Sequence, residues 1–443
     1  MKNRIALFFF LCLGVSNFAQ EKNWTLKECV LHALENNISV KQSLLDVALT
    51  DVEKQDAIGN FLPSINANGS VSKNTGLSLN PTNNELESTT FLSASGSVNA
   101  GYTLFDGLRN IRQVQRAKLS ALASQYRLTK MQDDIALFVA NAYLQILLNK
   151  ANLEVVKAQN QVTVSQIERT NDLVDGGVLP RGDLLEIQAT YASELQQIAI
   201  AENALTISKI NLAQLLLVED YQNFDIADED FTIIDEGISA QDVTTIITSA
   251  KENRAEVKIA EKNVELAEKD LQLARGAYYP TLSAFFGYNT RYADNDPLER
   301  DFTEQLYLND GIGYGLQLNV PILNGLSVRG NVQRNKINLQ RSKFQLEQAE
   351  LDLESNVYQA YVDAKGALKS YEAAKAALES QELAYQYARD RYDVGLTNAF
   401  DFSQSKLRYD NAQIEVNRAK YDYIFKLKVL ELYFGVPATE LKF

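Results

Sequence analysis

The chain has 443 residues, and its 57 acidic side chains outnumber the 43 Lys and Arg side chains, for a formal net charge of -14. An acidic surface repels a phosphate backbone, so we expect no nucleic acid among the partners. One His and two Cys in the whole chain exclude most metal sites, a disulfide framework and most histidine-based catalysis. We therefore predict no enzyme activity, no catalytic residues, no cofactor and no metal.

Residues 1–19 have the pattern of a secretory signal peptide. Lys2 and Arg4 form a basic start, an apolar run follows, and a plausible cleavage site precedes Gln20. The apolar run is shorter than the roughly 20 residues that a membrane-spanning helix needs, and no later stretch is apolar enough to span a bilayer as a helix. We expect export, and we expect any membrane-spanning part of the mature protein to be built from strands.

Helical patterns open both halves of the chain. In residues 26–60 and 243–277, apolar residues recur three or four positions apart without any Pro. Each pattern ends shortly before a proline, Pro63 or Pro280, because Pro disfavours the helical conformation in the residue before it. We predict one helix in each segment.

The periodicity then changes from helical to two, which is typical of strands. Apolar residues alternate with Ser, Asn and Gly in two pairs of segments, at about 63–73 and 91–105, and at about 280–291 and 311–323. Amphipathic strands of this length can cross an outer membrane when tilted. The connections within each pair are long and polar, as expected for outward-facing loops.

Long helical runs follow each strand pair, at about 106–176 and 324–394. They contain no Pro and few Gly, and their apolar residues recur at spacings of three and four, which predicts antiparallel coiled-coil packing. The many acidic residues along all the predicted helices are expected to be solvated. Each run ends in a glycine-containing turn, after which a returning helix is predicted at about 182–218 and 398–436.

The two halves match each other as a tandem duplication. At a constant offset of 218, Gly107 matches Gly325 and Gly177 matches Gly395, whereas the offset is 217 upstream of the strands. The predicted organisation is a signal peptide, a first repeat, a linker, a second repeat and a C-terminal tail, at 1–19, 20–220, 221–242, 243–438 and 439–443.

Four strands per chain are too few to close a barrel. An open sheet in lipid leaves unpaired backbone groups along both edges, so these strands require several chains. Three chains give twelve strands, an even number within the known range. The predicted fold is an α+β membrane protein: a trimeric β-barrel with four strands per chain, continued by a long antiparallel coiled-coil α-helical barrel.

A secreted or periplasmic coiled-coil scaffold without channel activity is the alternative. Its strands would form a small soluble sheet whose apolar face is buried against the chain's own helices. The helical stripes look occupied by helix packing, which leaves the apolar strand residues for lipid and favours the membrane protein.

The order helix, strand, strand, long helix, shorter helix occurs twice, over essentially all of residues 24–438, and it resembles the TolC family of outer membrane efflux proteins. The supporting motifs are the strand exits Phe105-Asp106-Gly107 and Leu323-Asn324-Gly325 and the tip Val394-Gly395-Leu396-Thr397. The resemblance implies a homotrimer in the outer membrane lipid of a Gram-negative bacterium, with its helices in the periplasm. It also implies a passive conduit of a tripartite efflux or type I secretion system, docked to a periplasmic adaptor protein and an inner-membrane RND or ABC pump.

The resemblance also assigns residues to a periplasmic aperture that closes like an iris. Tyr392 resembles the family's tip tyrosine, whose hydroxyl bonds an acidic residue, here Asp183. Asp401 resembles the first of two aspartates that line the constriction, and the second falls on Gln404. The family's tip arginine falls on Thr397, so one latch contact is missing.

Glu186 is the first-repeat counterpart of Gln404. Three copies of Asp401 around a narrow opening would favour cations. The docking tips implied by the resemblance are Gly176, Gly177, Val178, Leu179, Val394, Gly395 and Leu396.

Structural roles for the same residues stay open. Asp183 and Asp401 each follow a glycine turn and precede Glu or Gln by three positions, which fits a helix capping box, and capping can coexist with an aperture role. The tip glycines also fit helix stops, and Tyr392 equally fits a packing role.

Overall fold

A computed structural model describes residues 23–79, 85–228, 237, 241–296 and 298–437. The expected signal peptide and C-terminal tail, and much of the expected linker, lie outside the described residues. The chain divides into two compact units, and the long helices α3 (Arg109–Asp175) and α8 (Ser327–Asp393) contribute residues to both. The first unit comprises 1–41, 131–250 and 356–443, and the second comprises 42–130 and 251–355.

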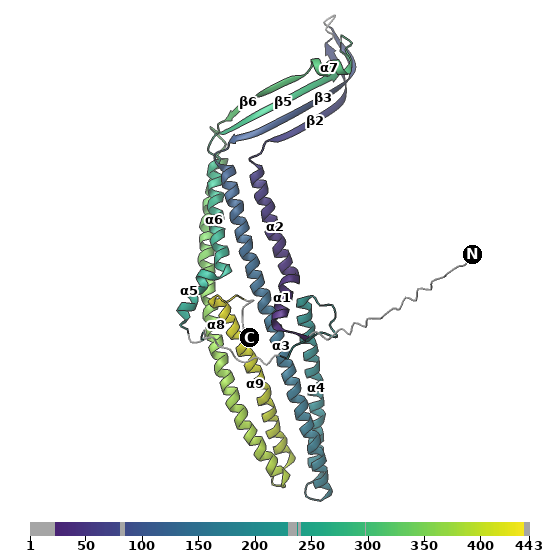
Figure 1. Ribbon diagram of the computed structural model, residues 1–443, viewed down its shortest axis with the longest axis vertical. Coiled ribbons are helices and arrows are strands. Elements are labelled where there is room, and N and C mark those ends of the chain that lie inside the picture. Colours follow the sequence, from purple (N-terminus) through teal and green to yellow (C-terminus); the bar gives the residue numbers. More distant parts are fainter. Residues whose placement is uncertain (1–22, 80–84, 229–236, 238–240, 297, 438–443) are drawn as a thin grey trace, which may run out of the picture. The chain divides into compact units, whose positions relative to one another are not determined.

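The second unit contains a four-stranded antiparallel sheet in the order β2-β3-β5-β6 (Figure 1). Its strands are β2 (Ser64–Leu79), β3 (Leu86–Phe105), β5 (Thr281–Ala293) and β6 (Gly311–Asn319). Helix α2 (Ile38–Gly59) leads into β2, β3 leads into α3, α6 (Ala255–Gly276) leads into β5, and β6 leads into α8. Each strand is therefore continuous at one end with one of these four helices.

The two faces of this sheet differ sharply in chemistry. The strand register aligns apolar residues across one face, as in the row Ala67, Val98, Tyr288 and Ile312. The next row, on the other face, is Asn68, Ser97, Asn289 and Gly311. The apolar face is not covered by the chain's own helices, since Ile65, Val71 and Ile312 are 69%, 71% and 64% exposed. A soluble scaffold would have buried it.

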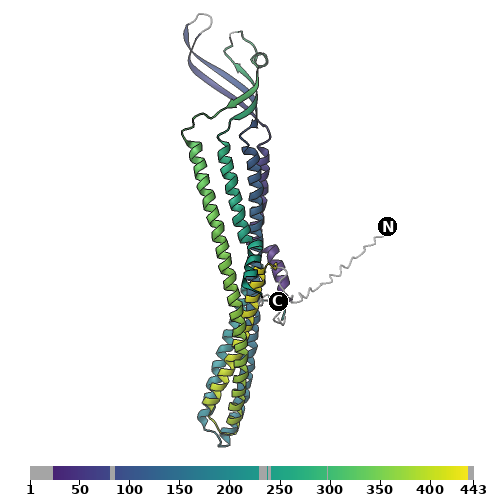
Figure 2. The same ribbon diagram turned by 90° about the vertical axis from the view of Figure 1, so that its left-hand side faces the viewer.

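The helices of the second unit lie side by side in the same order as the strands that they join (Figure 2). Helix α3 contacts α6, where the Arg116 guanidinium meets the Asp270 carboxylate at 2.5 Å and Arg112 donates to the Gln272 carbonyl at 2.6 Å. Helix α6 contacts α8 through the apolar cluster Leu271, Ala274 and Val332. Asn110 of α3 reaches the carbonyl of Asn60 at the end of α2.

The first unit ties the start of the chain to the segment after the first returning helix. Strands β1 (Asn23–Trp24) and β4 (Asp225–Ile226) pair in parallel, and the Tyr143 hydroxyl of α3 donates to the carbonyls of Trp24 and Ala227. Lys150 of α3 bonds both Asp225 and Asp228. The remaining helices here are α1 (Leu26–Asn36), α4 (Arg181–Leu216), α5 (Val243–Asn253) and α9 (Ala399–Phe434). Nowhere in the described residues does a helix have the length and apolar character of a membrane span.

The prediction of one helix over 26–60 is wrong, because Asn37 interrupts it between α1 and α2. Its backbone is extended (ψ 134), its Oδ1 accepts from the Ser39 amide, and its Nδ2 donates to the Leu215 carbonyl. The tertiary bond to α4 therefore fixes the break. Residues 243–277 are broken in the same way at Arg254, between α5 and α6.

Strand lengths also differ from the predicted ones. Strands β2 and β3 extend further toward their connecting loop, where pairs of hydroxyls such as Thr75 and Thr90 bond each other across the ladder. Strand β6 ends at Asn319 rather than near 323, because Pro321 has no amide hydrogen for the ladder. The connection before β6 holds a short helix, α7 (Phe302–Leu308), capped by Asp301, where only an irregular loop was expected.

The turn from β3 into α3 depends on close packing of two glycines. Gly107 has a φ of +75°, and a β-carbon there would lie 2.3 Å from the Gly276 carbonyl oxygen. Gly276 is equally crowded, since its β-carbon would lie 2.5 Å from the Arg109 side chain. Only glycine allows this approach of α3 to α6.

Substituting alanine at Gly107 and at its counterpart Gly325 distinguishes the stability cost of crowding from that of the left-handed backbone. Gly325 also has a positive φ, but a β-carbon there meets no atom within 4 Å. We expect Gly325→Ala to cost about 1 kcal/mol through the left-handed backbone, and Gly107→Ala to cost roughly 1–3 kcal/mol more through overpacking. Thermal unfolding followed by circular dichroism measures both losses. Equal losses would contradict the crowding at Gly107.

Candidate functional site: the paired helix tips

Both long helices end in the same glycine-dependent turn. At the end of α3, Gly177 has a φ of +74° and donates to the Val174 carbonyl, while the Val178 amide donates to the Leu173 carbonyl. These two bonds define a Schellman motif, which satisfies the last carbonyls of a helix. The end of α8 repeats both bonds around Gly395, and a β-carbon on Gly395 would lie 3.6 Å from Val178. The two tips of one chain thus lie against each other.

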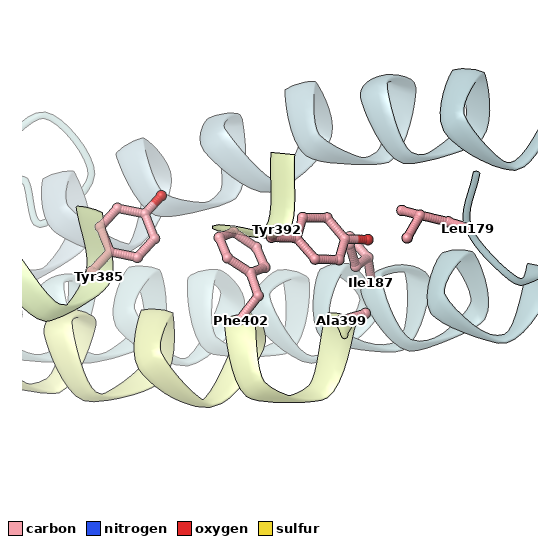
Figure 3. Close-up of a cluster of buried hydrophobic side chains, with 6 residues drawn as sticks. All are labelled: Leu179, Ile187, Tyr385, Tyr392, Ala399 and Phe402. Carbon is pink, nitrogen blue, oxygen red and sulfur yellow. The ribbon is translucent and has the colours of Figure 1, made fainter. Parts of the chain in front are cut away.

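A buried aromatic cluster joins the tips of α3, α4, α8 and α9. Tyr392 is completely buried and stacks on Phe402, with ring centroids 5.0 Å apart. Tyr385, Ile187, Ala399 and Leu179 complete the cluster around it, as Figure 3 shows. The cluster packs one returning helix from each half of the chain against the other.

Leu179 is buried rather than exposed at the tip surface, and its expected docking role stays a prediction. It packs into the buried cluster, because the turn after Gly177 directs it back toward α4. The exposed apolar residues of the tips are Val178, Val394 and Leu396, and Gly176, Gly177 and Gly395 are exposed beside them.

The hydroxyl of Tyr392 bonds Thr170 of α3 at 3.1 Å, rather than the expected Asp183. Thr170 is itself completely buried, so each hydroxyl satisfies the other inside the cluster. Burial is the main cause that raises the pKa of Tyr392, and the nearby negative charge of Asp183 acts in the same direction. Asp183 therefore lies near the tyrosine without bonding it.

Neither tip aspartate is the helix cap that the sequence pattern suggested. Asn398 caps α9 by accepting from the Asp401 amide at 2.8 Å, and Pro180 precedes α4 without a side-chain cap. Asp183 and Asp401 instead lie in the first turns of their helices, where the helix dipole favours a negative charge. The hydroxyl of Thr397 lies 3.4 Å from the Asp401 carboxylate, and Asp401 is exposed.

Glu186 and Gln404 both line one groove of about 200 Å³ between α4 and α9. The structure gives no contact between Asp183 and Asp401. An ion pair between Arg169 and Asp393, 3.0 Å apart, links the ends of α3 and α8.

The floor of this groove holds a buried charge cluster that the sequence analysis missed. Lys406 Nζ lies 2.7 Å from a carboxylate oxygen of Glu194 and 3.1 Å from one of Asp410. Glu194 also accepts from the Thr163 hydroxyl and the Asn160 amide of α3. The exposed fractions of Lys406, Glu194 and Asp410 are only 4%, 6% and 8%. The cluster thus binds α3, α4 and α9 together with one carboxylate in excess.

The excess carboxylate has a shifted protonation equilibrium. Burial raises the pKa of Asp410 from 3.8 to about 6, although the Lys406 ammonium opposes the shift, and Glu194 adds to it. The sequence did carry a signal for this cluster: Lys406 and Asp410 continue the buried stripe of α9 after Phe402, with opposite charges four residues apart. The expectation of solvated acidic residues along these helices is wrong at Glu194 and Asp410.

The raised pKa predicts that Asp410 stabilises the fold more at low pH. The folded carboxyl binds its proton more tightly than the unfolded one, so this contribution is complete below about pH 4 and is lost as the pH rises through 6. We expect a loss on the order of 2 kcal/mol over this range, which Asp410→Asn abolishes. Urea unfolding at a series of pH values measures it, with Asp390→Asn at an exposed carboxylate as the control. Parallel pH profiles for Asp410→Asn and the wild type would contradict the prediction.

Comparisons with known proteins agree with this architecture. A family model described as outer membrane efflux protein matches residues 30–216 and 246–436. Outer membrane protein TolC of Vibrio cholerae is 26% identical over 316 residues, which are 70% of this chain and 68% of that protein.

Two solved structures show the same fold at low sequence identity. The outer membrane protein VceC of Vibrio cholerae superposes with a TM-score of 0.78 at 16% identity, covering 93% of this chain and 96% of that chain. The CmeC outer membrane channel of Campylobacter jejuni gives a TM-score of 0.80 at 18% identity, covering 93% and 85%. The resemblance to the TolC family is confirmed, and the chain belongs to the outer membrane efflux protein family.

Proposed function

We propose that three copies of this chain form one channel across the outer membrane of a Gram-negative bacterium, with the helices in the periplasm. The channel is a passive conduit in a tripartite efflux or type I secretion system. It docks through its helix tips to a periplasmic adaptor protein and an inner-membrane RND or ABC pump. The observation that carries the proposal is the amphipathic sheet with two unpaired edges.

The sheet edges favour closure with further copies. Among the described residues, β2 pairs only with β3, and β6 pairs only with β5. Each unpaired backbone group costs several kcal/mol in hydrocarbon. Pairing of β2 in one chain with β6 in the next removes both edges, and three chains then give a closed barrel of twelve strands. The apolar face contacts lipid, and the polar face lines the lumen.

The helix edges of the second unit carry matching apolar stripes. Helices α2 and α8 are joined to the two edge strands, and each exposes large apolar residues at heptad-like spacing. They are Leu45, Leu49 and Val52 on α2, and Ile337, Phe344 and Leu351 on α8. Such residues bury well in a coiled-coil seam between neighbouring chains. The equal lengths of α3 and α8, 67 residues each, and of α4 and α9, 36 each, support a duplicated unit that repeats around this ring.

The tips provide a docking surface and an aperture. Val178, Val394 and Leu396 form an exposed apolar surface at the ends of the helical hairpins, which suits an adaptor protein. Asp401 is exposed in the adjoining first turn of α9, and three copies would form an acidic ring that favours cations. The buried pair of Tyr392 and Thr170 holds α8 against α3 and thereby restricts opening.

The alternative of a coiled-coil scaffold without channel activity has less support. It requires a cover for the apolar face of the sheet, and the described helices supply none.

Single-channel conductance in planar bilayers tests the function. We expect cation-selective openings from the wild type, weaker cation selectivity in Asp401→Ala, and more frequent or larger openings in Tyr392→Phe, because the tyrosine loses its bond to Thr170. Asp390→Asn, which removes a carboxylate outside the aperture, is the control for selectivity. Unchanged selectivity in Asp401→Ala would contradict the acidic aperture. A chain that stays soluble and monomeric without detergent would contradict the channel itself.

The helix seam has its own test. Phe344→Glu introduces a carboxylate into the proposed apolar seam, whereas Gln345→Glu introduces the same carboxylate about 100° further round the helix. We expect only Phe344→Glu to lower the temperature at which the detergent-extracted trimer dissociates on semi-native gels, because a buried unpaired charge is costly. Equal dissociation temperatures for the two variants would place the seam elsewhere.

A further inference from the structure

The polar face of the sheet is nearly free of charge. Where β3 pairs with β5, between Ser93 and Thr103, the side chains of this face are hydroxyls, amides, glycines, Ala293 and Phe285, apart from one. The exception is Arg291 of β5, whose register partner on β3 is Ser95.

Arg291 is exposed, and the structure gives its guanidinium no ion pair within the described residues. Its backbone is held in the sheet, because Arg291 lies in register with Ser95 of β3 and its carbonyl accepts from the Asn309 side chain at 3.1 Å. Ser95 beside it is bonded to Ser70 at 2.8 Å. The guanidinium therefore has hydroxyl neighbours and free donors.

Three of the acidic residues in the nearby connection have partners of their own. Asp294 accepts from the Leu92 amide at 2.7 Å, Asp296 pairs with Arg300 at 2.6 Å, and Asp301 caps α7. None of these carboxylates neutralises Arg291.

The glycines on the same face of the sheet include Gly287 on β5 and Gly315 on β6. A β-carbon at Gly287 would lie 3.2 Å from the Asn99 amide oxygen, and one at Gly315 would lie 3.1 Å from the ring of Phe285. Neighbouring side chains thus fold over these glycines.

We propose that Arg291 is a selectivity residue of the barrel lumen, where three copies form a ring of guanidinium groups that binds carboxylate or phosphate groups of passing cargo. The inference rests on the proposed function, because a ring requires three chains around one lumen. A guanidinium presents several donors in a fixed plane, which suits such anionic groups. Low-dielectric walls strengthen its field. The lumen would then favour anions at one end of a conduit whose helix tips favour cations.

Reversal potentials in a KCl gradient test this ring, with the channel opened by Tyr392→Phe. We expect Arg291→Gln to shift the permeability ratio several-fold toward K⁺, and Arg291→Lys to keep most of the original ratio. Lys73→Gln is the matched control, since its register partner is Leu92 and it lies on the opposite face. An unchanged ratio in Arg291→Gln would overturn the proposal.

Binding of tripolyphosphate to the detergent-extracted trimer tests the same ring without conduction. Calorimetry at low salt should give a several-fold weaker affinity for Arg291→Gln than for the wild type and for Lys73→Gln. Equal affinities for all three would overturn the ring. The native mass of each sample separates the two hypotheses: a trimer with unaltered binding rejects the role of Arg291, whereas a monomer rejects the proposed channel.

Discussion

The structure depends on one constraint: a sheet that is apolar on one face and polar on the other, with a free edge on each side. Within the described part of the chain, hydrogen bonds satisfy the backbone from β2 to β6, and the outer sides of these two strands have no strand partner. In water, solvent molecules can hydrogen-bond to the strand edges, but exposure of the apolar face is unfavourable. In lipid, the apolar face is favourably placed, but the unpaired backbone groups of the edges are costly. We propose that closure with further copies in a membrane meets both demands. The helices of the second unit lie in the same order as the strands that they join, so we propose that these helices close into a ring with the same neighbouring copies.

Charged groups are distributed unevenly among the candidate sites of the chain. The helix tips present Asp401 beside an apolar surface, the buried cluster under the α4–α9 groove carries one carboxylate in excess, and the polar sheet face carries Arg291. On the polar sheet face between Ser93 and Thr103 the other side chains carry no charge, so Arg291 determines the local charge there. We propose that such a channel selects weakly and that stronger selection belongs to the pump to which it docks.

The sequence predicted those features that depend on local periodicity. Alternation predicted the two faces of the sheet, and the glycines at 177 and 395 predicted where the long helices end. Features that depend on which helices meet were not predicted. The break at Asn37 depends on its hydrogen bond to the Leu215 carbonyl of α4. The Tyr392 hydroxyl bonds the Thr170 hydroxyl of α3, and not the Asp183 carboxylate of α4, because of how these helices pack. Lys406 and Asp410 were missed because charges on a helix were read as solvated, although they continue an apolar stripe.

Native mass spectrometry of the wild-type protein released from detergent micelles tests whether three chains close one barrel. We expect a single species with the mass of three copies of the mature chain, which remains intact until the protein denatures. A monomer that is stable without detergent would contradict this expectation, as would a closed assembly with a different number of copies.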